Sequence, residues 1–209
     1  MANRLEKENT VSVLVTREAP DFTASAVMPD GTIVADFKLS SLKGKYVALF
    51  FWPLDFTFVC PTEIIAHDHR YDDFKLRGVE VIGVSIDSQF THFAWRNTSP
   101  AQGGVGPIRF PMVADVKHDI CRAYGIEHPD GVALRATFLI DRSGIVRHQV
   151  VNDLAIGRNI DELIRIIDAL QFTEKYGEVC PAGWQKGKEG MKATADGVAS
   201  YLATHSKEL

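Results

Sequence analysis

The chain has 209 residues, of which 45% are apolar, and a formal net charge of −4 at pH 7. This length predicts one domain of ordinary size with an extension, and the apolar fraction is sufficient for a core. The mild negative charge does not favour nucleic-acid binding, and no apolar run approaches the roughly 18 residues of a membrane-spanning helix.

Apolar segments rich in β-branched and aromatic residues alternate with helical patterns. In chain order, the patterns predict a strand at 46–52, a helix at 62–76, a strand at 79–86, helices at 89–97 and 117–124, strands at 136–140 and 145–151, and helices at 159–170 and 191–205. Pro29-Asp30-Gly31 predicts a turn near the N-terminus, and Asp141-Arg142-Ser143-Gly144 predicts a hairpin turn between the last two strands. Such alternation predicts an α/β fold, with helices on both faces of a sheet.

The two ends of the sequence suggest no targeting signal. Residues 1–9 are polar and lack the apolar segment of a signal peptide. Ser206-Lys207-Glu208-Leu209 differs from a K-D-E-L retention signal, and we interpret it as a chance similarity. We therefore expect a cytoplasmic protein. In a reducing compartment its three cysteines are more often catalytic or metal-binding than part of a disulfide framework.

Cys60 lies between a predicted strand and a predicted helix, just before Pro61. Backbone N–H groups in the first turn of a helix are unpaired, and the helix dipole favours an anion there. A thiol in this position tends to ionise to the thiolate, which is its nucleophilic form. The alternative interpretation is a buried structural cysteine, since free cysteines are often buried. Position and neighbours together favour a reactive cysteine.

Two neighbours of Cys60 strengthen this interpretation, because Pro53, Thr57 and Cys60 form the pattern P-x-x-x-T-x-x-C. Thr57 precedes the cysteine by three residues, so its hydroxyl can reach the sulfur or an oxygen bound there. Pro53 has no backbone N–H to donate and can shield a small pocket from water.

Cys180 occurs in a context similar to that of Cys60, because Val-Cys-Pro is present at both positions. Beyond about residue 172 the chain changes character, with four glycines and one proline before its last helical pattern. We interpret this part as an arm that leaves the main domain. The expected organisation is a domain at 1–172 and an arm at 173–209 that carries Cys180.

These motifs resemble the typical two-cysteine peroxiredoxins of the alkyl hydroperoxide reductase C type. The resemblance extends over most of the chain, roughly from Ala19 to the C-terminus. The stretches that carry it are Phe-Phe-Trp-Pro-Leu-Asp-Phe-Thr-Phe-Val-Cys-Pro-Thr-Glu (50–63), Val-Ile-Gly-Val-Ser-Ile-Asp-Ser (81–88), Leu-Arg-Ala-Thr-Phe-Leu-Ile-Asp (134–141) and Gly-Glu-Val-Cys-Pro-Ala-Gly-Trp (177–184).

The resemblance implies a thioredoxin-like fold, with a central mixed sheet, a C-terminal arm and a last helix. It also implies a thiol-dependent peroxidase that reduces hydrogen peroxide and organic hydroperoxides. Cys60 would form a sulfenic acid, and Cys180 of the partner subunit would convert it to an intersubunit disulfide. The family forms homodimers that commonly assemble to decamers.

An external dithiol protein must reduce this disulfide, because the sequence contains no C-x-x-C. Thioredoxin or a flavoprotein disulfide reductase is the expected partner. No glycine-rich dinucleotide fingerprint opens any predicted helix, so we expect no cofactor.

Three charged residues complete the expected site. Arg135 lies in an otherwise apolar segment, where a buried guanidinium needs a partner such as a thiolate; without the family, a solvated arginine at a strand edge is an equal alternative. The resemblance implies that Arg135 is the active-site arginine and that Arg158 is a second arginine near the site. Glu63 could hold these arginines in place. The alternative for Arg158 is a solvated residue at a helix N-terminus.

The same residues allow other functions to be compared with a peroxidase. His67 and His69 are two positions apart, so on a helix they face different directions, and we expect no metal site. Glu63 occupies the place of the second cysteine of a C-x-x-C, which argues against a thioredoxin-type exchanger. A holdase chaperone or a peroxide-signalling thiol protein remains an alternative. Cys121 lies in an apolar helical pattern and is expected to be a buried structural thiol.

Overall fold

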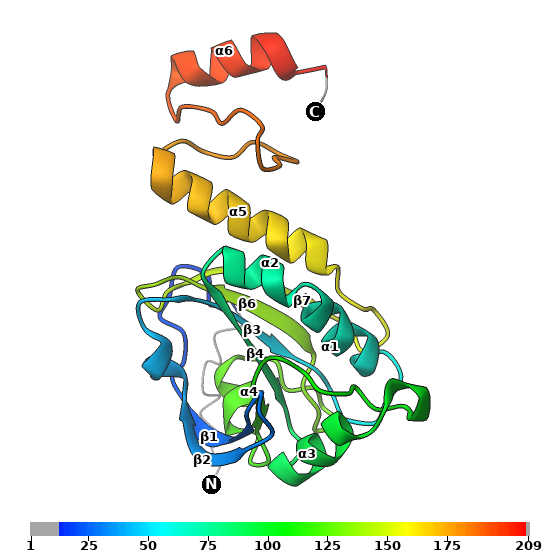
Figure 1. Cartoon of the computed structure of the whole chain (residues 1–209). Coiled ribbons are helices and arrows are strands. Elements are labelled where there is room, and N and C mark those ends of the chain that lie inside the picture. Colours follow the sequence, from blue (N-terminus) through cyan, green and yellow to red (C-terminus); the bar gives the residue numbers. More distant parts are fainter. Residues whose placement is uncertain (1–12, 208–209) are drawn as a thin grey trace, which may run out of the picture. The chain divides into compact units, whose positions relative to one another are not determined.

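The computed structural model describes residues 13–207 (Figure 1), so the expectations about residues 1–9, Glu208 and Leu209 lie outside the described residues. The strands in this part are β1 (Thr23–Val27), β2 (Ile33–Lys38), β3 (Tyr46–Phe51), β4 (Val79–Ser85), β5 (Met112–Ala114), β6 (Arg135–Ile140) and β7 (Val146–Asn152). The α-helices are α1 (Cys60–His69), α2 (Tyr71–Leu76), α3 (Gln89–Asn97), α4 (Asp119–Ala123), α5 (Ile160–Tyr176) and α6 (Ala195–His205), with short 3-10 helices at Leu39–Leu42 and Pro100–Gln102.

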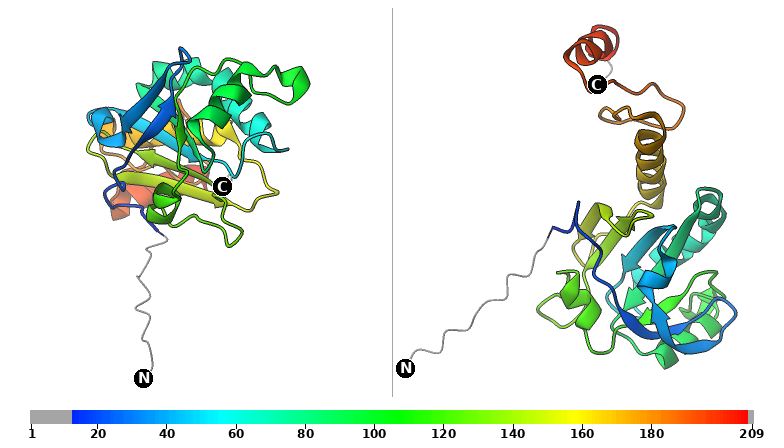
Figure 2. Two further views of the ribbon diagram at one scale, coloured as in Figure 1. Left: turned by 90° about the horizontal axis from the view of Figure 1, so that it is seen from below. Right: turned by 90° about the vertical axis from the view of Figure 1, so that its left-hand side faces the viewer.

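The strands between residues 13 and 207 form one seven-stranded sheet in the order β2-β1-β5-β4-β3-β6-β7. Strand β4 is parallel to both β3 and β5, whereas the other neighbours are antiparallel. The sheet can be followed in the two views of Figure 2. It is therefore the mixed sheet that the sequence predicted.

Helices cover both faces of the sheet, as predicted, and β3 shows how. Successive side chains of a strand point to opposite faces. The ring of Phe50 stacks on His67 of α1, with centroids 3.9 Å apart. The next residue, Phe51, contacts Tyr124, which directly follows α4, at 5.3 Å. All six residues of β3 are buried, as expected for a central strand covered on both sides.

Three strands were not predicted, namely β1, β2 and β5. Strand β1 consists largely of small residues, β5 has three residues, and β2 is an exposed edge strand without strict alternation. Their pairing partners, rather than their own sequences, make them strands. The predicted turns are confirmed: Gly31 N donates to Met28 O (2.9 Å) between β1 and β2, and Gly144 N donates to Asp141 O (3.0 Å) between β6 and β7.

Some helix limits also differ from the predictions. The helix predicted at 62–76 is two helices, α1 and α2, because Arg70 leaves helical geometry with φ −96° and ψ 8°. Helix α5 continues to Tyr176 and ends at Gly177, whose φ of 68° suits glycine. Helix α6 begins later than predicted, because Thr194 caps it by accepting a hydrogen bond from Gly197 N.

The chain forms two compact units, one up to Arg158 and the other from Asn159 onward. The first contains the sheet and helices α1 to α4, and the second contains α5, α6 and the segment between them. None of the helices in the described residues combines the length and apolar character needed to span a bilayer.

Gly83 of β4 leaves room for two aromatic rings of the β3 segment. A Cβ atom at this position would lie 2.6 Å from Trp52 Cζ3 and 3.0 Å from Phe50 Cζ. We therefore expect Gly83→Ala to lower the free energy of unfolding by about 1–3 kcal/mol, because both rings must leave their packed positions. Denaturant unfolding followed by tryptophan fluorescence measures the loss.

Gly157→Ala is the matched control, since the added methyl group would meet its nearest neighbour, Val59 Cγ1, at 3.4 Å. It should change the free energy of unfolding by no more than about 0.5 kcal/mol. Equal unfolding midpoints for Gly83→Ala and the wild type would contradict the tight packing at this position.

Candidate active site around Cys60

Cys60 is the first residue of α1 and follows a loop that begins at the end of β3. The loop starts where Trp52 N donates a hydrogen bond to Val84 O at 3.1 Å. Pro61 suits the beginning of a helix, because its φ is preset and its missing N–H would have no partner there. The Cys60 side chain is fully buried. Its sulfur therefore lies at a helix N-terminus, as predicted, where the dipole favours an anion.

Thr57 lies beside the sulfur, because the loop curls back before α1. Its Oγ1 is 2.9 Å from Cys60 Sγ and 2.8 Å from the carbonyl oxygen of Leu54. A hydroxyl carries one proton, so it donates to only one of these acceptors at a time. When the sulfur is a thiolate, it can accept a hydrogen bond from this hydroxyl.

Arg135 is the first residue of β6, and its side chain is 4% exposed. Its Nη1 is 3.4 Å from Cys60 Sγ and 2.8 Å from Glu63 Oε2, and its Nε donates to Leu154 O at 2.8 Å. The guanidinium is thus held from two sides while it faces the sulfur. This excludes the alternative of a solvated arginine at a strand edge.

Glu63 lies on the first turn of α1 and joins Arg135 to a second arginine, Arg158. The backbone N and Nε of Arg158 donate to Glu63 Oε1 at 2.9 and 2.8 Å, and its Nη2 donates to Oε2 at 2.9 Å. Arg158 Nη1 also donates to Ala136 O and to Thr137 Oγ1. The Arg158 side chain is only 3% exposed, which excludes its alternative as a solvated residue.

The charges of this group balance when the sulfur is ionised. Two buried arginines face one carboxylate, so a Cys60 thiolate brings the formal charge of the group to zero. Burial raises the pKa of the Glu63 carboxyl, but hydrogen bonds and charge from Arg158 and the charge of Arg135 outweigh it and place this pKa below its ordinary value of 4.5. Glu63 therefore stays ionised at neutral pH. Its contribution to stability is complete above about pH 4.5 and is lost as the pH falls through the lowered pKa.

Pro53 directly follows Trp52 and is buried. The same loop contains Asp55. The sequence alone did not predict that this residue fixes the loop. Asp55 Oδ1 accepts a hydrogen bond from Trp52 Nε1 at 2.8 Å, and its Oδ2 is 2.7 Å from His92 Nδ1. Burial raises the pKa of Asp55 despite His92. This buried pair anchors the loop to α3, and the signal in the sequence was a single acid among the apolar residues of Trp-Pro-Leu-Asp-Phe.

The two histidines of α1, His67 and His69, have different surroundings. His67 is fully buried, with Nδ1 2.7 Å from the carbonyl oxygen of Glu63. Burial lowers the pKa of His67 to about 3, so the ring is neutral at physiological pH. His69 is exposed. His67 therefore belongs to the core beside the Glu63 turn.

Cys180 lies in the second unit, in the segment between α5 and α6. It is half-buried, and its Sγ is 3.7 Å from the carbonyl oxygen of Ala169 on α5. Its neighbour Val179 exchanges two backbone hydrogen bonds with Met191, at 2.8 and 2.9 Å. Burial raises the pKa of the Cys180 thiol above its ordinary value of 9.0, and the charge of Arg165 opposes that effect.

A tryptophan organises the segment around Cys180. Trp184 is 4% exposed, and its ring lies 4.8 Å from that of Phe172. Its carbonyl oxygen accepts a hydrogen bond from Arg165 Nη1 at 2.8 Å, and its Nε1 donates to Lys188 O at 3.1 Å. The glycines and the single proline of this segment thus lie in turns that fold it back on α5.

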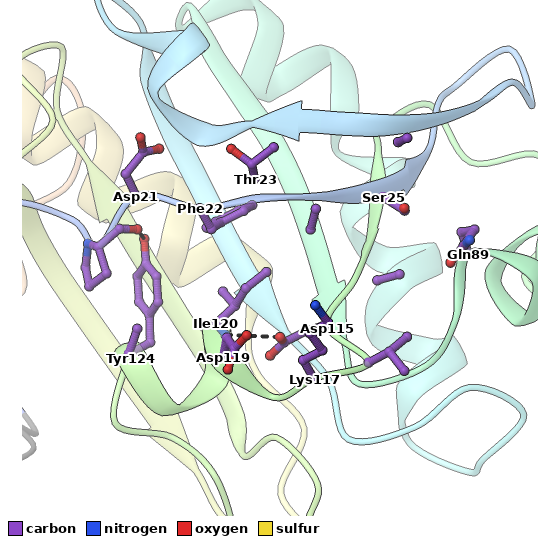
Figure 3. A pocket seen from close by; sticks show the side chains of 16 residues that line it. Asp21, Phe22, Thr23, Ser25, Gln89, Asp115, Lys117, Asp119, Ile120 and Tyr124 are labelled. Carbon is purple, nitrogen blue, oxygen red and sulfur yellow. Dashed lines mark hydrogen bonds between the residues drawn. The ribbon is translucent and has the colours of Figure 1, made fainter.

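A cavity of about 540 Å³ lies elsewhere in the first unit, between β1 and α4 (Figure 3). None of the residues grouped around Cys60 lines it. Tyr124 Oη donates to Pro20 O at 3.0 Å, and Asp115 Oδ1 accepts from Ile120 N at 3.0 Å. These polar groups already have partners within the fold, and the cavity is separate from the Cys60 site.

Comparison with known proteins places this geometry in a family. Residues 15–149 match the AhpC/TSA family, and residues 169–204 match the C-terminal domain of 1-Cys peroxiredoxin. Alkyl hydroperoxide reductase C from Buchnera aphidicola is 56% identical over 196 residues, which cover 93% of this chain and 100% of that protein. Peroxiredoxin-1 from Gallus gallus is 50% identical over 190 residues, which cover 90% of this chain and 95% of that protein.

Solved structures agree. The crystal structure of reduced 2-Cys peroxiredoxin from Plasmodium vivax superposes with a TM-score of 0.90 at 52% identity, covering 92% of this chain and 100% of that chain. This likeness confirms the predicted thioredoxin-like fold. With half or more of its residues shared over nearly its whole length, the chain belongs to the peroxiredoxins of the AhpC/TSA family, as its two cysteine motifs had predicted.

Proposed function

We propose that Cys60 is the nucleophile of the thiol-dependent peroxidase activity that characterises this family. The observation that carries the proposal is the convergence of two donors on one buried sulfur. Thr57 Oγ1 is 2.9 Å and Arg135 Nη1 is 3.4 Å from Cys60 Sγ. Donors that point at this sulfur can also hold the oxygens of a peroxide that approaches it.

In the first step, the Cys60 thiolate attacks the terminal oxygen of hydrogen peroxide or of an organic hydroperoxide. The O–O bond breaks, the sulfur is oxidised to a sulfenic acid, and the leaving oxyanion takes a proton from solvent to become water or an alcohol. Arg135 and Thr57 stabilise the charge that develops on the leaving oxygen. Pro53 shields the sulfur from water without offering a competing N–H.

In the second step, the sulfenic acid condenses with Cys180 of the partner subunit, releasing water and forming an intersubunit disulfide. The turn-rich segment that carries Cys180 supports this assignment, because it can leave α5 without disturbing the sheet. Thioredoxin or a flavoprotein disulfide reductase then returns both sulfurs to thiols. The absence of C-x-x-C from the sequence supports the need for an external reductant.

We propose a homodimer that assembles to a decamer in the cytoplasm, with a peroxidase domain at 1–172 and an arm at 173–209. Strand β7 ends the strand order. Residues 16–18 pair with the chain at Ile145 and Val146, and no strand of residues 13–207 pairs with the rest of the outer edge of β7. Such an edge suits pairing with a second sheet. Exposed aromatic side chains in the loop before α1 and on α3 suit a second interface: Phe56, Phe58, Phe90 and Phe93.

A non-reducing gel of the wild type and Cys180→Ser, each treated with one equivalent of peroxide, tests the cycle. We expect a disulfide-linked dimer in the wild type that requires peroxide, because only the sulfenic acid reacts with the second thiol. The variant should remain monomeric on the gel with an oxidised Cys60.

Two other outcomes would contradict parts of the proposal. A wild type that loses its Cys60 thiol but stays monomeric would place resolution within one chain or show a one-cysteine cycle. An unreacted Cys60 thiol in both proteins would show that the nucleophile is another group.

Glu63→Gln tests the positioning of the two arginines. Because this change leaves both guanidinium groups buried without their carboxylate, we expect a loss of about 3–5 kcal/mol in the free energy of unfolding. We also expect a roughly 100-fold slower reaction of Cys60 with peroxide, since Arg135 is no longer held toward the sulfur. Stopped-flow fluorescence measures the rate, and denaturant unfolding measures the stability.

Glu80→Gln is the matched control, because Glu80 pairs with Lys45 and Lys75 at 3.0 and 2.9 Å and lies outside the Cys60 group. It should leave the peroxide rate unchanged. Arg158→Lys keeps the charge but loses the fork of donors, and we expect a folded protein with an intermediate rate. Wild-type rates in folded Glu63→Gln and Arg158→Lys would show that the ion-pair group does not position Arg135.

Arg165 tests the ionisation of Cys180. Arg165→Lys and Arg165→Gln both lose the guanidinium hydrogen bond to Trp184 O, but only Lys keeps the charge that lowers the pKa of Cys180. In the Cys60→Ser background, in which Cys180 stays beside α5, we expect a neutral thiol reagent to modify Cys180 faster at pH 7 in the Lys variant, because more Cys180 is thiolate. Mass spectrometry of the Cys180 peptide measures the rate; the two rates should converge at high pH, and equal rates at pH 7 would show that this charge does not act on Cys180.

A further inference from the structure

A second group of reactive side chains lies in the first unit, outside the Cys60 site. His118 immediately precedes α4, Cys121 lies on α4, and Glu127 follows it. One ligand atom from each residue lies within 4.8 Å of the other two. His118 Nδ1 is 2.8 Å from Glu127 Oε1, and Cys121 Sγ is 3.3 Å from the carbonyl oxygen of His118.

We propose that His118, Cys121 and Glu127 form a binding site for a divalent cation of the zinc type, with the remaining coordination position taken by water. Thiolate, imidazole and carboxylate are the donors that zinc prefers, in tetrahedral geometry. Metal–ligand bonds of about 2.0–2.3 Å place such donors roughly 3.3–3.8 Å from each other. Small side-chain rotations bring these three ligand atoms to that spacing.

The backbone already holds two of the ligands in place. His118 has φ 62° and ψ 14°, a left-handed conformation that residues other than glycine seldom adopt. It turns the imidazole toward Glu127. The carboxylate of Asp115 accepts hydrogen bonds from Ile120 N (3.0 Å) and Cys121 N (2.7 Å), which fixes the start of α4. The backbone at His118 and Cys121 is therefore already fixed in the protein without a bound metal.

Glu127 is held by the hairpin that leads into β6. It pairs with Ala133 in an isolated bridge, and Leu134 N donates to Ile126 O at 2.8 Å. A bound cation would tie α4 to this hairpin, directly before Arg135. The site thus connects to the strand that carries the arginine of the Cys60 group.

Arg122 takes the place of the cation in the metal-free protein. Its Nε is 2.9 Å from Glu127 Oε2, and its Nη2 is 3.1 Å from Oε1. The Arg122 side chain is 55% exposed, so it can move into solvent when a cation arrives. The side chains of His118 and Glu127 are 22% and 27% exposed, whereas Cys121 is buried. The cation enters past the histidine and the glutamate and reaches a buried sulfur.

Binding exchanges protons and ligands without any change of oxidation state. The Cys121 S–H bond breaks, its proton passes to solvent, and a sulfur–metal bond forms. His118 binds the cation through Nδ1, with its ring proton on Nε2 in the metal-bound form. Glu127 exchanges the guanidinium of Arg122 for the metal.

Cobalt(II) is the probe, because a thiolate–cobalt bond produces a charge-transfer band. The full chain with Cys60→Ser and Cys180→Ser keeps Cys121 as its remaining thiol, since the sequence has three cysteines. We expect the band to saturate at one equivalent of cobalt and to disappear on addition of zinc. A further Cys121→Ala change should abolish it. His118→Asn, which tolerates the left-handed backbone, should weaken cobalt binding at least about tenfold.

Two positions outside the buried core make the test independent of folding. Glu127→Gln should weaken cobalt binding, whereas Arg122→Gln should strengthen it several-fold, because it frees the carboxylate from a competing cation. His128→Asn, on the same hairpin but outside the cluster, should leave binding unchanged. The proposal is overturned if no band appears at one equivalent, if the band survives in both His118→Asn and Glu127→Gln, or if Arg122→Gln weakens binding.

Discussion

The carboxylate of Glu63 is the interaction on which the geometry around Cys60 depends. It accepts four hydrogen bonds from two buried arginines, Arg135 and Arg158. Two guanidinium groups could not be buried side by side without such a counter-charge. Glu63 lies one turn after Cys60 on α1. The same helix therefore supplies the sulfur and the carboxylate that holds the Arg135 guanidinium beside it.

The sheet supports this arrangement through packing. Strand β3 is buried on both faces, and the loop that follows it is fixed by the Asp55–His92 pair and by the ring of Trp52. Gly83 on the neighbouring strand allows that ring to lie close to the sheet. The position of Thr57 is therefore determined by contacts that precede the helix, while the position of Arg135 is determined by the start of β6.

The three cysteines have different surroundings, and these differences correspond to different chemistry. Cys60 faces a hydroxyl and a guanidinium, which donate hydrogen bonds to a thiolate. Cys180 lies near a carbonyl oxygen, which accepts a hydrogen bond only from a thiol. Burial and the nearby Asp115 raise the pKa of Cys121 to about 12, so without a metal it remains a thiol. Cys121 is buried as the sequence predicted.

The sequence by itself determined the fold class, the position of Cys60 at a helix start, the turns at 29–31 and 141–144 and the family, because these depend on local patterns and short motifs. It did not reveal β1, β2 and β5, which are strands because of their neighbours. It also did not reveal the Asp55–His92 pair. His118 and Cys121 have a spacing, His-x-x-Cys, that can hold a metal, but the sequence did not show that Glu127 lies beside them. Only the tertiary structure decided that Arg135 and Arg158 are buried on one carboxylate. Arg135 and Arg158 are 72 and 95 positions from Glu63 in the sequence. The folding of the sheet brings them to its carboxylate, and no local sequence pattern indicates this contact.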